Sequence, residues 1–376
     1  MQQSIGGGPP VLGRPFAGVT RFFTAPVHRV IRGVARLVGT ELDSALARVA
    51  PLIGHSVPGA RREAALAILN GVLGDHLAET GNPLAISMSL RRGSRAIDVD
   101  DAESARRALS GARQKVLVLV HGSCLGDRCW TRAGHDVAAA LERDLGFTCL
   151  HLNYNTGRHI SRNGTELAKL LEHVIGAWPV HLDELVLVGH SMGGLVARSA
   201  CHAGDTLGHT WRRKLTNLVC IASPHHGAPL ERGGNWIDVL LGVTHYSAPL
   251  ARLGMIRSAG VTDLRFGSVL DEHWRARDRF AARGDPRTWL ELPERVQCYA
   301  MAATRTSEPG AGPYASDGLV SVDSALGRHR RAELTLAFPD THQWIGFGMG
   351  HLDLLGHPEA YDILRSWLSD RGQLAP

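Results

Sequence analysis

Four short apolar runs constrain the fold of this chain more than any other feature of the sequence. In each run apolar residues follow one another, instead of alternating with polar ones, which is typical of a strand buried on both faces of a parallel sheet. Helical stretches separate the runs, so the sequence predicts a mostly parallel sheet with helices on both faces, an α/β class. The runs are Val116–Val120, Thr148–Leu152, Leu185–Val188 and Leu218–Ala222, and the helical stretches between them include Thr165–Trp178 and Met192–Cys201.

The regular alternation of strands and helices is interrupted once. Residues 225–292 combine many large apolar side chains with Gly and Pro, and we interpret them as an inserted helical cap. The sheet is expected to resume at Val296–Ala302 and again at Glu333–Phe338, with a last helix over Glu359–Leu368. Residues 82–376 are therefore expected to form one domain that carries the cap at about 225–292.

The first 81 residues lie outside this pattern and predict a helical extension. Residues 1–20 are rich in Gly and Pro and predict a flexible segment, whereas residues 24–50 and 60–80 show helical spacing of apolar residues. Residues 24–38 place arginines beside an apolar stripe, a pattern that fits peripheral contact with a membrane surface. The simpler interpretation is a helix packed on the main domain with solvated arginines.

The charge balance, with 41 basic and 36 acidic residues among 376, gives a formal net charge of +5. Only three of the basic residues are lysines, and the arginines are scattered rather than grouped, so we expect no nucleic-acid partner. No run approaches the roughly 18 apolar residues that span a bilayer. The first fifteen residues lack the pattern of a signal peptide. The expected location is cytoplasmic, with membrane association as the alternative.

One motif carries the chemistry of the chain. Gly189-His190-Ser191-Met192-Gly193-Gly194 follows the apolar run Leu185–Val188 and precedes a helical stretch. This G-x-S-x-G pattern between a strand and a helix is typical of the nucleophile elbow of α/β-hydrolases. A serine raised on so tight a turn needs small neighbours, because its backbone is strained and crowded. The sequence thus predicts Ser191 as a nucleophile.

A serine hydroxyl needs a general base that is oriented by a carboxylate. In this fold the acid and then the base follow the serine along the chain. Asp317 lies in a turn after the expected strand Val296–Ala302, and His351 lies in a loop before the final helix. We therefore predict Asp317 and His351 as the partners of Ser191. The rival candidates are His342 and His357 for the base and Asp323 and Asp340 for the acid.

The oxyanion of the reaction needs two backbone N–H groups. One should come from Met192, the residue after the nucleophile, and the other from the turn after the first parallel strand. In that turn Ser123 is the predicted donor, with Cys124 as the near alternative. His121 is expected to support the turn by hydrogen bonding rather than to take part in the reaction.

These motifs together resemble the lipase-like α/β-hydrolases, which include bacterial triacylglycerol lipases and esterases related to GPI inositol-deacylases. The resemblance covers roughly residues 112–376 and implies the triad Ser191, Asp317 and His351. It also implies that Ser223–Gly227 supports the floor of the site. The motifs are H-G-S at 121–123, G-H-S-M-G-G at 189–194, S-P-H-H-G at 223–227, S-D-G-L-V at 316–320 and G-H-L-D at 350–353.

The resemblance also raises the question of a metal ion. In calcium-dependent lipases the aspartate of H-L-D is a ligand, and Asp353 occupies that position here. His357 stands where a glutamine ligand is expected, so we predict no cofactor and leave calcium open. His225 and His226 are expected to be structural, because no carboxylate or cysteine lies at ligand spacing.

Together these features predict a serine hydrolase of carboxylic esters whose substrate is a small-molecule or lipid ester with a hydrophobic acyl group. The apolar insertion at 225–292 could line or cover a pocket for that acyl group. The same acyl-enzyme would serve an acyltransferase, an amidase or a polyester depolymerase, and these alternatives stay open.

Overall fold

The computed structural model describes residues 59–93, 95–98, 100–228, 258–275, 285, 287–307 and 315–369. The contacts divide the chain into two compact units, Met1–Arg62 and Glu63–Pro376. Residues 63–79 thus group with the larger unit, although the sequence analysis places the domain boundary at residue 81. The stretch 24–50 and most of the expected cap at 225–292 lie outside the described residues.

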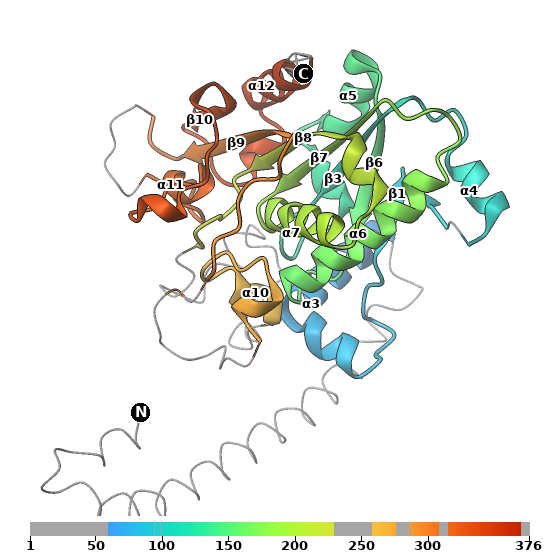
Figure 1. Ribbon diagram of the computed structural model, residues 1–376, viewed down its shortest axis with the longest axis horizontal. Helices are drawn as coiled ribbons and strands as arrows, with labels where there is room; N and C mark the ends of the chain where they lie inside the picture. Colours follow the sequence, from blue (N-terminus) through green and yellow to red (C-terminus); the bar gives the residue numbers. More distant parts are fainter. Residues whose placement is uncertain are drawn as a thin grey trace, which may run out of the picture. The chain divides into compact units, whose positions relative to one another are not determined.

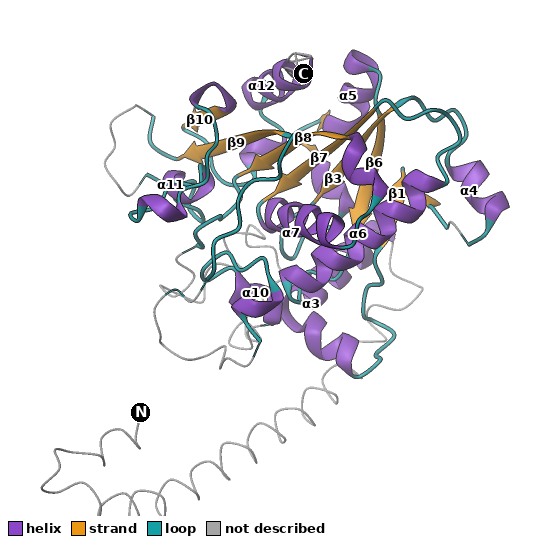
Figure 2. Cartoon of the chain, viewed as in Figure 1, coloured by secondary structure: helices purple, strands orange, loops and turns teal. Residues whose placement is uncertain are grey.

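An eight-stranded sheet organises the larger unit, with the order β10-β9-β8-β7-β3-β6-β1-β2. All neighbours from β10 to β6 run parallel, whereas β1 pairs antiparallel with β6 and with β2. Figure 2 shows the sheet between layers of helices. The strands are β1 (Ser89–Arg92), β2 (Arg95–Ala96), β3 (Lys115–Val120), β6 (Thr148–Asn153), β7 (Glu184–His190), β8 (Leu215–Ile221), β9 (Gln297–Thr304) and β10 (Gln343–Phe347).

The central strands are largely apolar because both faces of the sheet are covered there. In β3, Val116, Val118 and Val120 pack into one core together with α6 and α7. Leu117 and Leu119 point to the opposite face and pack with α5 and α12. The helices are α3 (Gly59–Glu79), α4 (Ala102–Ala108), α5 (Val137–Leu145), α6 (Ile160–Gly176), α7 (Met192–Thr206), α10 (Ala259–Asp263), α11 (Val322–Ala325) and α12 (Pro358–Ser369) (Figure 1).

The four apolar runs of the sequence form β3, β6, β7 and β8, and each pairs in parallel with its neighbour as predicted. The expected parallel sheet with helices on both faces is therefore confirmed. A separate two-stranded ribbon joins β4 (Thr131–Arg132) and β5 (His135–Asp136). Short 3-10 helices lie at Asp127–Trp130, Thr210–Lys214, Asp271–His273, Ala332–Leu334, Asp340–His342 and Asp353–Leu355.

The strand expected at Glu333–Phe338 is wrong. Leu334, Leu336 and Phe338 are buried, but their segment begins as a 3-10 helix and continues without strand pairing. Its backbone bonds locally, since the Leu336 N–H donates to the Gly327 carbonyl at 2.9 Å. The edge strand is instead β10, which is less buried and lacks a continuous apolar run, because an edge strand is covered less than a central one.

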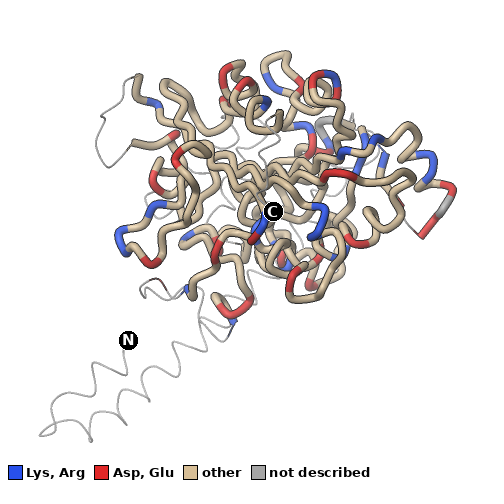
Figure 3. The backbone as a smooth tube through the Cα atoms, turned by 45° about the horizontal axis from the view of Figure 1, so that its top comes forward, with Lys and Arg blue, Asp and Glu red and all other residues tan. Residues whose placement is uncertain are grey.

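Among the helices of the described ranges, none has the length and apolar composition that a bilayer crossing requires. Basic and acidic residues are interspersed along the described backbone (Figure 3), in agreement with the scattered charge of the sequence.

The packing of α6 against α7 generates a stability prediction. Gly164 of α6 lies so close to α7 that an added Cβ would sit 2.3 Å from Ser199 Oγ and 2.9 Å from the Ala200 nitrogen. We expect Gly164→Ala to cost about 1–3 kcal/mol of stability through overpacking. Circular dichroism should show a lower melting temperature for this variant.

The matched control is Gly176→Ala at the last residue of α6, where nothing lies within 4 Å of the added Cβ. This variant should melt at or slightly above the wild-type temperature, since alanine is the better helix former. Equal melting temperatures for the two variants would contradict close packing between α6 and α7.

Candidate active site

Ser191 occupies a strained turn between the end of β7 and the start of α7. Its backbone has φ 55° and ψ −124°, a region that non-glycine residues rarely adopt. The turn is crowded, because a Cβ at Gly193 would lie 2.0 Å from the Val120 carbonyl oxygen. At Gly189 it would lie 2.4 Å from the Gly194 nitrogen. The two glycines of the motif are therefore required by close backbone contacts, as expected for a nucleophile elbow.

Asp317 and His351, which are 34 positions apart in the chain, form a buried pair. The distance from His351 Nδ1 to Asp317 Oδ2 is 2.7 Å, and the two residues are only 3% and 1% exposed. The other carboxylate oxygen of Asp317 accepts hydrogen bonds from the Leu319 and Val320 N–H groups, each at 2.8 Å. This arrangement fixes the carboxylate in position and orients the imidazole.

The pKa of Asp317 reflects opposing effects. Burial by itself raises the pKa of this carboxyl group, because it disfavours the charged form. The partner His351 and the N–H groups of Val320 and Leu319 stabilise the carboxylate, and the net result is a pKa below the usual value. Asp317 is therefore ionised near neutral pH, as a group that orients a histidine must be.

His190 and Arg305 hold the backbone around this pair. His190 Nε2 donates to the His351 carbonyl at 3.1 Å, and the two imidazole centroids lie 4.7 Å apart. Burial lowers the pKa of His190 to about 3, so the ring is neutral at physiological pH. Arg305 Nε donates to the Asp317 carbonyl at 3.1 Å, and the His351 N–H donates to the same oxygen at 3.1 Å.

The pair lies beside the residue that precedes the nucleophile, because the His351 ring contacts the ring of His190. His351 Nε2 is buried and has no hydrogen-bond partner among the residues that the structure describes. Ser191 itself is 6% exposed. The imidazole therefore keeps one nitrogen on the carboxylate and the other available.

The predicted oxyanion residues lie on the two turns that meet at Ser191. A Cβ at Gly122 would lie 2.9 Å from Ser191 Cβ, which places the turn after β3 against the nucleophile. In that turn the Cys124 N–H donates to Thr156 Oγ1 at 3.2 Å, so this amide is already bonded. That bond favours Ser123 over its alternative Cys124. Met192 is the buried first residue of α7, where helical N–H groups lack a partner within the helix.

His121 supports the turn after β3. Its carbonyl accepts a hydrogen bond from the Tyr154 hydroxyl at 2.7 Å, and its ring stacks on Tyr154 with centroids 4.5 Å apart. Burial lowers the pKa of His121 to about 4. These contacts agree with the structural role that the sequence analysis assigns to this residue.

The rival candidates make their contacts elsewhere. His342 Nδ1 lies 3.1 Å from the Cys298 carbonyl, and its ring stacks on Tyr299. Asp323 and Asp340 are exposed, and His357 Nδ1 accepts a hydrogen bond from the Glu359 N–H. None of these side chains is hydrogen bonded to His351 or Asp317 in the described part of the chain.

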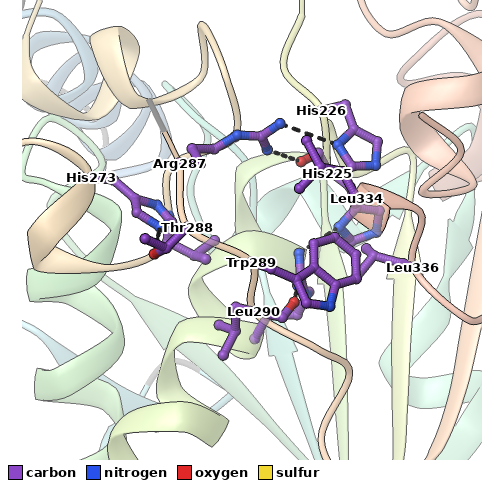
Figure 4. Close-up of a pocket in the computed structure, with 12 residues that line it drawn as sticks. His225, His226, His273, Arg287, Thr288, Trp289, Leu290, Leu334 and Leu336 are labelled. Carbon is purple, nitrogen blue, oxygen red and sulfur yellow. Dashed lines mark hydrogen bonds between the residues drawn. The ribbon is translucent and has the colours of Figure 1, made fainter. Parts of the chain in front are cut away.

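The histidines of the S-P-H-H-G turn are held by arginines. Figure 4 shows Arg287 with hydrogen bonds to both, through the His225 carbonyl at 2.7 Å and His226 Nδ1 at 3.2 Å. Arg198 of α7 lies 3.3 Å from His225 Nδ1, and Arg287 also pairs with Asp285. Burial lowers the pKa of His225 well below its usual value. The contacts are those of a structural turn.

The question of a metal ion centres on Asp353. Its carboxylate accepts a hydrogen bond from the Gly350 N–H at 2.8 Å and lies 3.7 Å from Arg132. Across the described ranges, no three His, Cys, Asp or Glu side chains converge as a metal-binding group. Calcium therefore stays only an expectation raised by the resemblance.

Sequence reasoning missed the supporting roles of His190, Arg305 and Thr156. His190 stands within the G-x-S-x-G motif, so its position could have drawn attention to it. Arg305 and Thr156 carry no local signal, because their contacts join segments that are distant in the chain.

The buried histidines predict how stability depends on pH. Burial lowers the pKa of His190 to about 3 and those of His121, His226 and His273 to about 4. Below about pH 6.5 the unfolded chain binds protons at these rings that the folded chain does not bind, so stability falls as the pH falls. Each ring contributes up to about 1.4 kcal/mol per pH unit in that window.

Calorimetry should therefore show a melting temperature that declines steeply from pH 6.5 to 4.5. The lowered pKa of Asp317 also makes stability fall as the pH falls, at the acidic end of the range. Its carboxylate is ionised more readily in the folded chain than in the unfolded chain, so protonation of this group favours unfolding. Above about pH 7.5 these histidines are almost entirely neutral in both states, so the range from there to about pH 8.5 is the internal control. A melting temperature that does not change between pH 6.5 and 4.5 would contradict the neutral, buried imidazoles.

The family comparison agrees with the fold. Residues 113–289 match the family model of the PGAP1-like alpha/beta domain. The sequence matches no curated protein. A mature lipase of Bacillus licheniformis is similar in structure, with 17% identity and a TM-score of 0.43 over 68% of this chain and 91% of that one. A lipase of Staphylococcus hyicus has 14% identity and a TM-score of 0.37 over 68% and 94% of the two chains.

The parallel sheet, the strained serine turn at the end of its central strand β7 and the family match agree with one another. The chain therefore has the α/β-hydrolase fold, and the family resemblance expected from the sequence agrees with the match of residues 113–289 to the PGAP1-like alpha/beta domain.

Proposed function

We propose that the chain is a serine hydrolase of carboxylic esters. The observation that carries the proposal is the combination of Ser191 on its strained turn with the buried Asp317–His351 pair. A serine hydroxyl is a weak nucleophile that becomes effective when a neutral imidazole accepts its proton. The free Nε2 of His351 is the acceptor on this chain.

The reaction proceeds in two halves. Ser191 Oγ attacks the ester carbonyl carbon, and its proton passes to His351 Nε2. The tetrahedral intermediate collapses, the alcohol leaves with the proton from His351, and an acyl-enzyme remains on Ser191. Water then attacks the acyl carbon while His351 takes a proton from it. Collapse of the second intermediate returns that proton to Ser191 and releases the carboxylic acid.

Two further groups of residues lower the barriers. Asp317 orients the imidazole through Nδ1 and stabilises the imidazolium that forms in each half. The N–H groups of Ser123 and Met192 would hold the oxyanion of the intermediates. Loss of one such donor typically costs about 2.7–4 kcal/mol of transition-state stabilisation.

Formation of the acyl-enzyme does not by itself specify which molecule accepts the acyl group from Ser191. An alcohol or amine in place of water would make the chain an acyltransferase, and the same triad could open an amide or a polyester. The substrate is expected to be a small-molecule or lipid ester, and contact of residues 24–38 with a membrane stays a prediction that lies outside the described residues. Product analysis with an added alcohol separates hydrolysis from transfer.

The first test removes the nucleophile. Ser191→Ala should lower the turnover of p-nitrophenyl butyrate by several orders of magnitude and abolish labelling by a fluorophosphonate probe. Ser366→Ala changes an exposed serine of α12 and is the matched control, which should keep both activities. Continued labelling of the Ser191 variant by the fluorophosphonate probe would contradict the proposal.

The second test addresses the carboxylate. Asp317→Asn keeps the shape of the side chain but removes the charge that orients His351, so kcat should fall by about four orders of magnitude. Asp323→Asn alters an exposed rival and should leave kcat within about twofold of the wild type. The comparison is made by steady-state kinetics at pH 8, and similar values for the two variants would exclude Asp317 from the triad.

A further inference from the structure

Helix α3 lies outside the matched domain but contacts the turn that follows β3. The family match begins at residue 113, whereas α3 ends at Glu79. A Cβ at Gly71 would lie 2.2 Å from Cys124 Sγ and 3.0 Å from both the Cα and the nitrogen of Cys124. The helix backbone therefore touches the backbone of the turn itself, and only a glycine permits this separation.

The next contacts of α3 are with the loop between β6 and α6. Asn155 Nδ2 donates to the Gly74 carbonyl at 2.8 Å, and a Cβ at Gly74 would lie 1.8 Å from Asn155 Oδ1. Gly157 is equally close to the helix, because its Cβ would lie 2.2 Å from the Asn70 carbonyl oxygen. Gly71 and Gly74 of α3 thus face the turn after β3 and the β6–α6 loop, respectively.

Thr156 connects these two loops. It lies between Asn155 and Gly157, is 1% exposed and accepts the Cys124 N–H on its hydroxyl at 3.2 Å. A shift of the β6–α6 loop is therefore transmitted to the turn that contains Ser123.

Helix α3 is also tied to α10, which lies within the insertion at 225–292. Ser258 Oγ donates to the Gly71 carbonyl at 2.7 Å, and the Ala259 N–H donates to Asp75 Oδ2 at 2.8 Å. Helix α10 is in turn bonded to the β6–α6 loop, since the Gly260 N–H donates to the Gly157 carbonyl at 2.9 Å. The β6–α6 loop is consequently held between α3 and α10 on both sides.

We propose that α3 is a positioning element of the active site, which holds the oxyanion turn through Gly71 directly and through Thr156 by way of the β6–α6 loop. This inference rests on the proposed function. The contacts to Cys124 occupy the neighbouring amide and set the orientation of the Ser123 N–H. A donor displaced by about 1 Å can cost a hundredfold in rate, so small movements of α3 reach the chemistry. Gly71, Gly74 and Thr156 act through the turn and not on the substrate.

The first experiment pushes α3 away from the turn. Gly71→Ala should lower kcat by about ten- to a hundredfold with KM within about twofold, because the oxyanion is bound only after attack. Gly59→Ala, in the same helix with nothing within 4 Å of its added Cβ, is the matched control and should keep the wild-type kcat.

The inhibition constant of a trifluoromethyl ketone reports on the oxyanion hole directly. It would not change if Gly71 had a purely structural role. Ser191 Oγ adds to the ketone carbonyl and its proton passes to His351, which leaves an oxyanion in the hole. The inhibition constant of the ketone should rise in parallel with the fall of kcat in Gly71→Ala. A lower kcat with an unchanged inhibition constant would overturn the positioning role.

The second experiment does not depend on the folding of the Gly71 variant. Thr156→Val removes the acceptor of the Cys124 N–H at nearly constant volume, and Thr156→Ser keeps it. The valine variant should show the same kinetic signature as Gly71→Ala, whereas the serine variant should retain most of the activity. Equal activity of the two variants would overturn the link through Thr156.

A double variant tests whether the effect passes through Cys124. Cys124→Ala removes the Sγ that lies 2.2 Å from the added Cβ. It should restore part of the lost kcat when combined with Gly71→Ala. No recovery in the double variant would argue against direct contact as the route.

Failure of the inference differs from failure of the proposed function. If the full wild-type chain neither hydrolyses p-nitrophenyl esters nor reacts with a fluorophosphonate, the proposed function is wrong and the inference fails with it. If the wild type is active and both Gly71→Ala and Thr156→Val keep the wild-type kcat and ketone affinity, only the role of α3 is rejected.

Discussion

The first turn of α7 lies in direct contact with the carboxyl ends of the central strands, and the rest of the site depends on this contact. Gly193 touches the Val120 and His121 carbonyls of the neighbouring strand end, and Gly194 touches the Ser223 hydroxyl. No side chain larger than hydrogen fits at these separations. Because the helix starts so close to the sheet, the chain reaches it through a sharp turn, and Ser191 at that turn takes a positive φ. One packing constraint thereby places the nucleophile, the turn after β3 and the turn after β8 together.

Neutral imidazoles fill the space around this contact. Burial removes water from His121, His190 and His225 and lowers the pKa of each ring, so each offers one donor and one acceptor nitrogen instead of a charge. His190 uses its donor to hold the backbone of His351, which leaves the His351 side chain to Asp317. The negative charge of the pair thus comes from Asp317, whose carboxylate is stabilised by the partner imidazole and by backbone N–H groups. The same burial makes the fold sensitive to acid.

Much of the fold could be predicted from local patterns. The apolar runs that became β3, β6, β7 and β8 are buried on both faces, and burial on both faces leaves a continuous apolar signal. That signal is absent from β10, an edge strand with partial burial, whereas the neighbouring segment Glu333–Phe338 has the stronger apolar pattern without being a strand. The segment is buried although it pairs with no strand. Its backbone is irregular, and its core side chains are Leu334, Leu336 and Phe338.

For the candidate site, local patterns were sufficient to locate the elbow at Ser191 and to give a short set of acids and bases that could serve it. These depend on short-range constraints, because a strand, a glycine turn and a helix follow one another along the chain. The pairing of Asp317 with His351, the bond from the Cys124 N–H to Thr156 and the contact of α3 with the turn after β3 appear only in the folded chain. Those contacts join segments from 30 to more than 50 positions apart, and they follow from the order of strands and the packing of loops at one end of the sheet. Such long-range packing leaves no periodic trace in the local sequence, which is why it appears only in the folded chain.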